Sequence, residues 1–266
     1  MAGVRCWHVD AFTDRPFGGN PAAVCWLDAI REKSWMQSVA AEMNLSETAF
    51  VRRRNDGLEL RWFTPTMEVD LCGHATLATA RALLTDGLVP PNESIRFHTR
   101  SGVLTCQPDS DGDFIELNFP ATPPVEIEPA EFLIESLGAR PQYTGASKFY
   151  QLAVFDDSQF VRTVQPDYVA MKKLATLGVI ISAPSDDSKF DFISRFFAPA
   201  MGVDEDPVCG SAHCCLTPYW SERLGKTNLM AYQASARGGV LRLQLEGDRV
   251  ILGGQAVIVS RGECYC

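Results

Sequence analysis

Residues 63–75 read FTPTMEVDLCGHA, and residues 197–212 read FAPAMGVDEDPVCGSA. Both stretches run from a phenylalanine to a cysteine followed by glycine, and the second carries a short insertion before the cysteine. A second pair of strings, RSGVL at 100–104 and RGGVL at 237–241, repeats at nearly the same offset. This offset is about half the length of the 266-residue chain, so the sequence indicates a duplicated unit rather than a short-period solenoid.

The hydrophobic pattern predicts an α+β fold in which each half wraps strands around one apolar helix. Residues 73–84 are mostly Ala, Leu and Thr, so a helix there must be buried. The second copy is a similar helix over 210–220, which Pro218 should kink or shorten. Ser34 and Gln37 form a candidate capping box for a third helix that ends near Met43. Strands are expected at 4–12, 22–27, 47–51, 58–63, 179–184 and 190–197.

The composition limits the possible partners and the compartment. A formal charge of −9 argues against a broad surface for nucleic acid or anionic membranes, while a small carboxylate ligand stays open. No apolar run is long enough to span a bilayer, and the start of the chain lacks an apolar secretory segment. The odd count of nine cysteines favours free thiols, so we expect a cytoplasmic protein.

One cysteine and histidine cluster raises the question of a metal. It consists of Cys209, His213, Cys214 and Cys215 and has no second pair at zinc-finger spacing. No metal site is therefore expected.

The two Cys-Gly strings are candidate ligand sites. A helix that starts at Gly73 or Gly210 leaves its first N–H groups unpaired, and its dipole attracts an anion. Two such ends facing each other would clamp a carboxylate. The same field is expected to lower the pKa of Cys72 and Cys209. The alternative is that both cysteines are small buried hydrophobic residues.

Polar residues near these strings are candidates for proton transfer. Glu47 begins an apolar strand, where a shielded carboxyl suits proton transfer, although an ordinary strand-edge glutamate fits the same pattern. His74 is either a proton shuttle or a helix cap. Asp206 precedes the second Cys-Gly string and is a candidate to accept a proton or orient His74. Ser211, the counterpart of His74, and Ser46 are candidate hydroxyl donors to an anion.

Four strings follow one another in an order that resembles a known family. They are Asn20-Pro21, NLSETAF at 44–50, DLCGHA at 70–75 and EDPVCGSAH at 205–213. Together they resemble the phenazine-biosynthesis isomerase-like family of the diaminopimelate-epimerase-like superfamily. The similarity runs essentially end to end and is greatest to phenazine biosynthesis-like domain proteins of uncertain substrate.

This resemblance implies two similar domains, each a curled mixed sheet or half-barrel around a central helix, with the active site in the cleft between them. The expected domains are 1–119, completed by the last C-terminal residues, and 120–266. In the isomerase branch, a glutamate matching Glu47 moves a proton between carbons, and residues matching His74, Asp206 and Ser211 surround the substrate. These proteins use no metal or organic cofactor, act in biosynthetic processes and are commonly homodimers.

The prediction is thus a cofactor-independent isomerase that moves a proton on a small carboxylate-bearing metabolite. Glu47 is its general base and acid, His74 and Asp206 position or relay protons, and the anion contacts are Ser46, Gly73, Gly210 and Ser211.

Two alternatives remain open. In the epimerase branch, thiols at the positions of Cys72 and Cys209 act on opposite faces of an α-carbon. The first alternative is therefore an amino- or imino-acid racemase or epimerase. A dehydratase that uses one of the thiols belongs to the same alternative. The second alternative is a non-catalytic interaction protein on the same fold.

Overall fold

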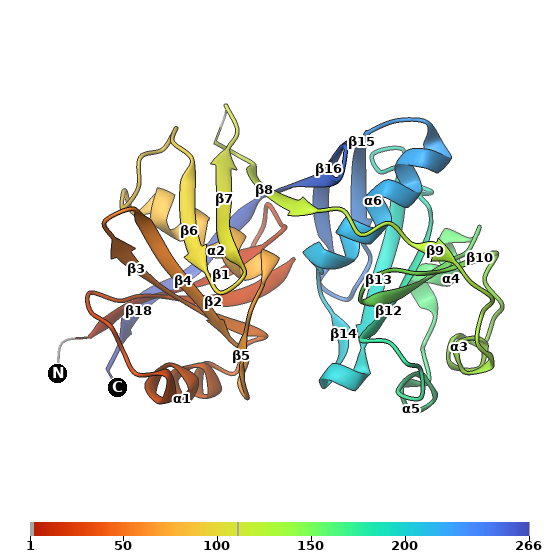
Figure 1. Ribbon diagram of the computed structural model, residues 1–266, viewed down its shortest axis with the longest axis horizontal. Helices are drawn as coiled ribbons and strands as arrows, with labels where there is room; N and C mark the ends of the chain where they lie inside the picture. Colours follow the sequence, from red (N-terminus) through yellow and green to blue (C-terminus); the bar gives the residue numbers. More distant parts are fainter. Residues whose placement is uncertain (1–2, 111, 266) are drawn as a thin grey trace. The chain divides into compact units, whose positions relative to one another are not determined.

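The computed structural model describes residues 3–110 and 112–265, and the chain forms two compact units (Figure 1). Unit 1 comprises Met1–Asn118 and Gly253–Cys266, and unit 2 comprises Phe119–Leu252. Within the described residues, no helix is both long and apolar enough to cross a membrane.

The strands of unit 1 form a mixed sheet. Going outward from the first strand, successive neighbours are antiparallel, parallel, antiparallel, parallel and antiparallel. The strands in this order are β1 (Val4–Ala11), β2 (Asn20–Trp26), β3 (Glu47–Arg54), β4 (Gly57–Phe63), β6 (Ile95–Thr99) and β7 (Gly102–Pro108). Three others complete the sheet: β18 (Ala256–Cys264) beside β1, β5 (Glu68–Val69) beside β4 and β8 (Ile115–Pro120) beside β7.

Unit 2 repeats this order of strand directions. Its neighbours are again antiparallel, parallel, antiparallel, parallel and antiparallel. The strands are β10 (Tyr143–Ala146), β11 (Tyr150–Val154), β12 (Gly178–Pro184), β13 (Phe192–Ala198), β15 (Asn228–Gln233) and β16 (Gly239–Glu246). Two short strands, β9 (Val125–Glu126) and β14 (Val203–Asp206), pair with β10 and β13; β17 (Arg249–Gly254) follows β16 in the chain. The duplication seen in the sequence is thus a duplication of sheet topology.

One helix is central to each unit. In unit 1, α2 (Gly73–Thr85) packs against β1, β2, β3 and β18, and in unit 2, α6 (Gly210–Leu224) packs against β11, β15 and β16 (Figure 1). Both helices are buried over most of their length, as their apolar sequences predict. The remaining helices are α1 (Lys33–Met43), α3 (Glu131–Leu137), α4 (Ser158–Thr163), α5 (Tyr168–Met171) and the 3₁₀ turn η1 (Pro199–Met201). The predicted α+β class, with curled mixed sheets around central helices, is confirmed.

Two local predictions were wrong. Ser34 does not cap α1, because the N-cap is Glu32 and makes no side-chain capping bond. Pro218 does not end α6, which continues to Leu224. Proline lacks the N–H that would bond the carbonyl of Cys214, one turn earlier. The backbone N–H of Thr122 bonds that carbonyl instead, at 3.0 Å, so the helix continues without an orphaned acceptor.

The same ion pair holds the segment before each Cys-Gly string. In unit 1, Nε of Arg61 donates to Glu68 at 2.7 Å; in unit 2, Nε of Arg195 donates to Glu205 at 2.7 Å and Nη2 adds a second bond at 2.9 Å. Each arginine lies two residues before the phenylalanine of the repeat, and each glutamate four residues before the cysteine.

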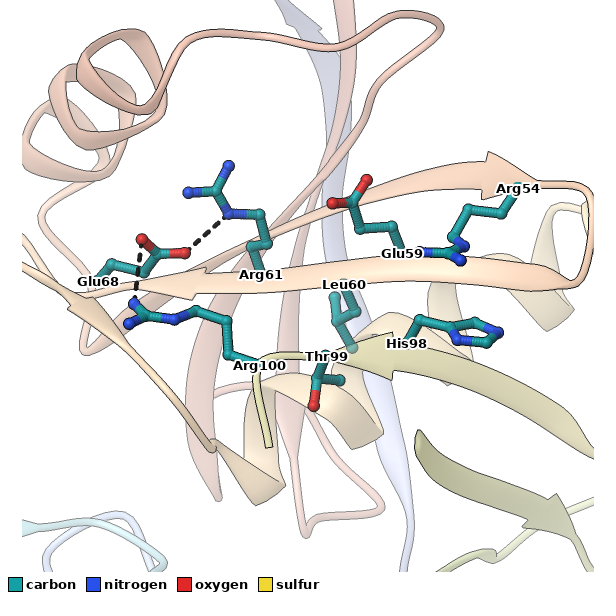
Figure 2. Close-up of a pocket in the computed structure, with 8 residues that line it drawn as sticks. All are labelled: Arg54, Glu59, Leu60, Arg61, Glu68, His98, Thr99 and Arg100. Carbon is teal, nitrogen blue, oxygen red and sulfur yellow. Dashed lines mark hydrogen bonds and ion pairs between the residues drawn. The ribbon is translucent and has the colours of Figure 1, made fainter. Parts of the chain in front are cut away.

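The surroundings of the two ion pairs differ. Figure 2 shows Arg61 and Arg100 on either side of Glu68, at the edge of a pocket of about 360 Å³ that contains none of the predicted site residues. Lys33 also contacts Glu68, at 3.2 Å. Arg195, by contrast, is buried and pairs with Glu205. Its guanidinium also donates to the backbone oxygens of Val161 and Val164, and these four residues belong to unit 2.

We therefore expect Arg195→Ala to destabilise the protein more than Arg61→Ala. Removing Arg195 leaves a carboxylate and two carbonyls without their donor, which costs about 3–5 kcal/mol. Glu68 keeps two other cations when Arg61 is removed, so that change should cost about 1 kcal/mol. Urea unfolding of the two variants measures the difference, and equal losses would show that the two ion pairs are energetically alike.

Candidate functional site

Three predicted residues of unit 1 meet at the start of α2. Glu47 is the first residue of β3, Cys72 is the N-cap of α2, and His74 is the second residue of that helix. Nε2 of His74 lies 3.1 Å from Oε2 of Glu47, and Sγ of Cys72 lies 3.6 Å from Nδ1 of His74. The Glu47 contact is an ion pair rather than a directed hydrogen bond. Carboxylate, thiol and imidazole therefore lie together beside the positive end of a helix.

A chain of polar contacts orients the imidazole. The Ser46 hydroxyl donates to Oδ1 of Asn20 at 3.0 Å, and Nδ2 of Asn20 lies 3.2 Å from Nδ1 of His74. An amide nitrogen only donates, so Nδ1 of the neutral ring accepts and the ring proton lies on Nε2, facing Glu47. When the ring gains a second proton on Nδ1, the Asn20 amide must turn to present its oxygen. The structure thus gives Ser46 an orienting contact, and it adds Asn20, to which the sequence analysis gave no role.

The charges around His74 favour its protonated form. Burial acts to lower the pKa of His74, but its interactions with Cys72 and Glu47 outweigh this effect and hold that pKa well above its usual value. Burial also raises the pKa of the Cys72 thiol, the Glu47 charge adds to this effect, and His74 opposes it. At neutral pH this favours a histidine cation beside a carboxylate.

In unit 2, the start of α6 has a different set of side chains. Cys209 is the N-cap, and its Sγ lies 3.2 Å from Oγ of Ser211, which in turn contacts the Tyr150 hydroxyl at 2.8 Å. Gln233 accepts from the N–H of Cys209 at 2.9 Å and donates to the carbonyl of Asp206 at 2.7 Å. The site in this unit therefore includes Tyr150 and Gln233, which no local motif marks.

Asp206 lies in the turn before Cys209. Its carboxylate accepts from the backbone N–H of Val208 at 3.1 Å, so it shapes the chain that leads into α6. Its expected partner, His74, belongs to the other unit. A relay through Asp206 therefore stays a prediction.

The expected low thiol pKa was wrong for both cysteines. Cys209, like Cys72, is only 7 % exposed, and burial raises its pKa, with a further contribution from the negative charge of Asp206. The cost of desolvating a thiolate thus outweighs the field of the helix end. Both groups are thiols at neutral pH.

The two halves of the duplication carry different chemistry. Thr48 of β3 pairs with Phe63 of β4, and Val179 of β12 pairs with Phe197 of β13, the phenylalanine of the second repeat. The residue before Val179, Gly178, is therefore the counterpart of Glu47. A Cβ atom at Gly178 would lie 2.5 Å from the Phe196 ring, so this position leaves no room for an acid. Ser211 takes the place of His74. At these two equivalent positions, unit 1 carries a carboxylate and an imidazole, and unit 2 carries a glycine and a serine.

The donor atoms of Glu47, Cys72 and His74 all lie within 4.8 Å of one another, so these residues could also hold a metal ion. The cluster considered from the sequence is arranged differently: Nδ1 of His213 lies 2.8 Å from the Cys209 carbonyl, and Nε2 lies 3.4 Å from the Ser194 hydroxyl.

This duplicated topology, with a cysteine at the start of each central helix, defines the class of diaminopimelate-epimerase-like proteins. A sequence profile described as "Phenazine biosynthesis-like protein" matches residues 9–262. The chain belongs to that family, which confirms the resemblance found in the sequence.

Individual relatives agree with this assignment. An uncharacterized isomerase of Halalkalibacterium halodurans is 51 % identical over 257 residues, which cover 96 % of each chain. The crystal structure of a PhzF-family phenazine biosynthesis protein from Enterococcus faecalis is 40 % identical, with a TM-score of 0.95 over 100 % of both chains. A hydroxyproline epimerase from Agrobacterium vitis, 11 % identical, shares the fold with a TM-score of 0.64 over 98 % of this chain and 92 % of its own. The chain is an isomerase of this family.

The raised thiol pKa values predict slow alkylation of Cys72 and Cys209 in the native protein. At pH 7 each should react with iodoacetamide at least about tenfold more slowly than free cysteine. Mass spectrometry of labelled peptides measures both rates, with the partly exposed Cys264 as internal control and urea-unfolded protein as reference. Labelling of either cysteine at the rate of the unfolded chain would contradict the assignment as thiols.

Proposed function

We propose that this isomerase moves a proton on a small carboxylate-bearing metabolite, with Glu47 as general base and acid and without a metal or organic cofactor. The observation that carries the proposal is the contact between Glu47 and His74. The Glu47 side chain is 18 % exposed, so it is shielded yet reachable, and an imidazole already faces it. A reactive carboxylate in this setting fits general acid–base catalysis.

The proposed steps conserve protons and electrons within the substrate. Glu47 takes a proton from one carbon, the electron pair of the broken C–H bond moves through the substrate, and Glu47 returns the proton to another carbon. His74 is the positioning group for the Glu47 side chain, because its Nε2 lies 3.1 Å from Oε2 of Glu47.

The helix starts are the proposed anion sites. The first N–H groups of α2 and α6, from Gly73 and Gly210 onward, lack intrahelical acceptors, and Ser211 adds a hydroxyl. Ser46 contributes through its contact with Asn20. Asp206 keeps a proposed role in proton relay in addition to its observed contact with Val208. We further propose the homodimer that the family resemblance implies.

A two-thiol racemase or epimerase is the second candidate, because Cys72 and Cys209 are the N-caps of the two central helices. Two observations disfavour it. Burial raises the pKa of both thiols, whereas the mechanism needs one thiolate. The positions of Glu47 and His74 are also a glycine and a serine in unit 2, an asymmetry that a mechanism with two equivalent thiols does not require.

Deuterium incorporation from heavy water into a panel of small unsaturated, cyclic, amino and imino acids separates the two candidates. For Glu47→Gln we expect a loss of about 10²–10⁴-fold in exchange, because the amide cannot accept the proton. The matched controls are Cys72→Ser and Cys209→Ser, which should keep exchange within about tenfold of the wild type if Glu47 carries the reaction.

The opposite pattern would overturn the proposal. Exchange that survives in Glu47→Gln and is lost in either serine variant would assign the reaction to the thiols. Unfolding midpoints of the three variants close to that of the wild type would exclude misfolding as the cause of either pattern.

A further inference from the structure

The side chains at the start of α2 also form a donor set for a cation. Glu47 offers an oxygen, Cys72 a sulfur and His74 a nitrogen, and these three donor types are the usual ligands of Zn²⁺. Hard cations such as Mg²⁺ and Ca²⁺ take oxygen ligands, so a mixed set with a thiol favours a softer ion. The chemistry of the donors therefore points to zinc.

The distances between the donors are close to those of a zinc site. Nε2 of His74 lies 3.1 Å from Oε2 of Glu47 and 4.0 Å from Sγ of Cys72. With bond lengths of 2.0–2.3 Å, neighbouring ligands of a tetrahedral zinc are about 3.3–3.7 Å apart. The two observed spacings bracket this value, although Sγ of Cys72 lies nearer Nδ1 of His74, at 3.6 Å, than Nε2. Binding one ion through Nε2 therefore requires the Cys72 side chain or the imidazole ring to rotate.

Burial leaves one direction open for a fourth ligand. Cys72 and His74 are buried, while Glu47 is the most exposed member of the set. Oε2 of Glu47 is itself buried, so a water molecule would reach a bound ion only past the exposed part of the Glu47 side chain. Three protein ligands and one water form the open arrangement that zinc adopts where exchangeable ligands bind.

The residues behind His74 can support the bound ion. When Nε2 of the His74 imidazolium coordinates a metal, the Nε2 proton leaves, and the proton that remains on Nδ1 needs an acceptor. Asn20 provides one by turning its amide oxygen toward Nδ1. Ser46 can release that oxygen because its hydroxyl also lies 3.1 Å from the carbonyl of Pro21. The Cys72 thiol and the His74 imidazolium each lose one proton to solvent, so two protons are released for each ion bound at neutral pH.

We propose that Glu47, Cys72 and His74 bind one Zn²⁺ ion, and that the bound ion inhibits the enzyme by occupying the carboxylate that transfers the proton. The binding half of this inference stands on the donor geometry alone. The inhibitory half rests on the proposed function.

Titration of metal-free, reduced protein with Co²⁺ tests the binding. We expect one equivalent to produce a thiolate-to-cobalt charge-transfer band in the near ultraviolet, which Zn²⁺ then displaces. Cys72→Ser should abolish the band, and Glu47→Gln should weaken Co²⁺ affinity by about tenfold or more. Cys209→Ser and Cys25→Ser are the matched controls and should keep the band. Cys25 is included because its Sγ lies 3.2 Å from that of Cys6, so these two thiols are the other place where cobalt could bind sulfur.

A missing band in the wild type, or a band that persists in Cys72→Ser, would overturn the site. If Cys72→Ser unfolds, the Glu47→Gln titration decides, because an unchanged affinity there excludes the carboxylate as a ligand. Deuterium exchange measured in the presence of Zn²⁺ tests inhibition separately. Full activity of the zinc-loaded enzyme would overturn the inference that the bound ion inhibits the reaction. The cobalt band does not depend on turnover. The titration therefore tests metal binding even if Glu47 proves not to transfer the proton.

Discussion

The ion pair between Glu47 and His74 is the interaction on which the proposed chemistry of unit 1 depends. It joins the first residue of a strand to the first turn of a helix, two elements that the parallel β2–β3 pairing and the packing of α2 on this sheet hold in place. Inside the fold, the pairing offsets the cost of burying both groups, and it raises the pKa of His74. The same contact therefore ties the start of the strand to the start of the helix and holds Glu47 where the proposed proton transfer requires it.

The two halves share one scaffold, but the proposed acid–base pair of Glu47 and His74 lies in unit 1. Both units keep the strand order, the Cys-Gly helix start and the arginine–glutamate pair before it. They differ where chemistry is expected: Gly178 with the Phe196 ring occupies the place of Glu47, and Ser211 replaces His74. Unit 2 offers hydroxyl and amide donors, which suit anion binding, and unit 1 offers an acid–base pair.

Much of the fold was predictable because the repeat and the apolar helices are patterns that can be read from neighbouring residues. For example, the helix predicted over 73–84 corresponds to α2 (Gly73–Thr85). Features that depend on distant partners were not. Pro218 lies inside α6 because Thr122, nearly a hundred residues earlier, bonds the freed carbonyl. The contacts of Asn20 and Tyr150 cross from strand to helix, and no local motif marks them. The thiol pKa values were predicted with the wrong sign because burial, which needs the three-dimensional structure, outweighs the helix field.

The state of His74 is the most direct test of the central contact. Nuclear magnetic resonance of protein labelled with ¹⁵N-histidine reports both ring nitrogens as a function of pH. We predict that His74 is an imidazolium at pH 7, that its pKa falls in Glu47→Gln, and that the neutral ring formed at higher pH carries its proton on Nε2. A His74 that is already neutral at pH 7, or that carries its proton on Nδ1 when neutral, would contradict the account.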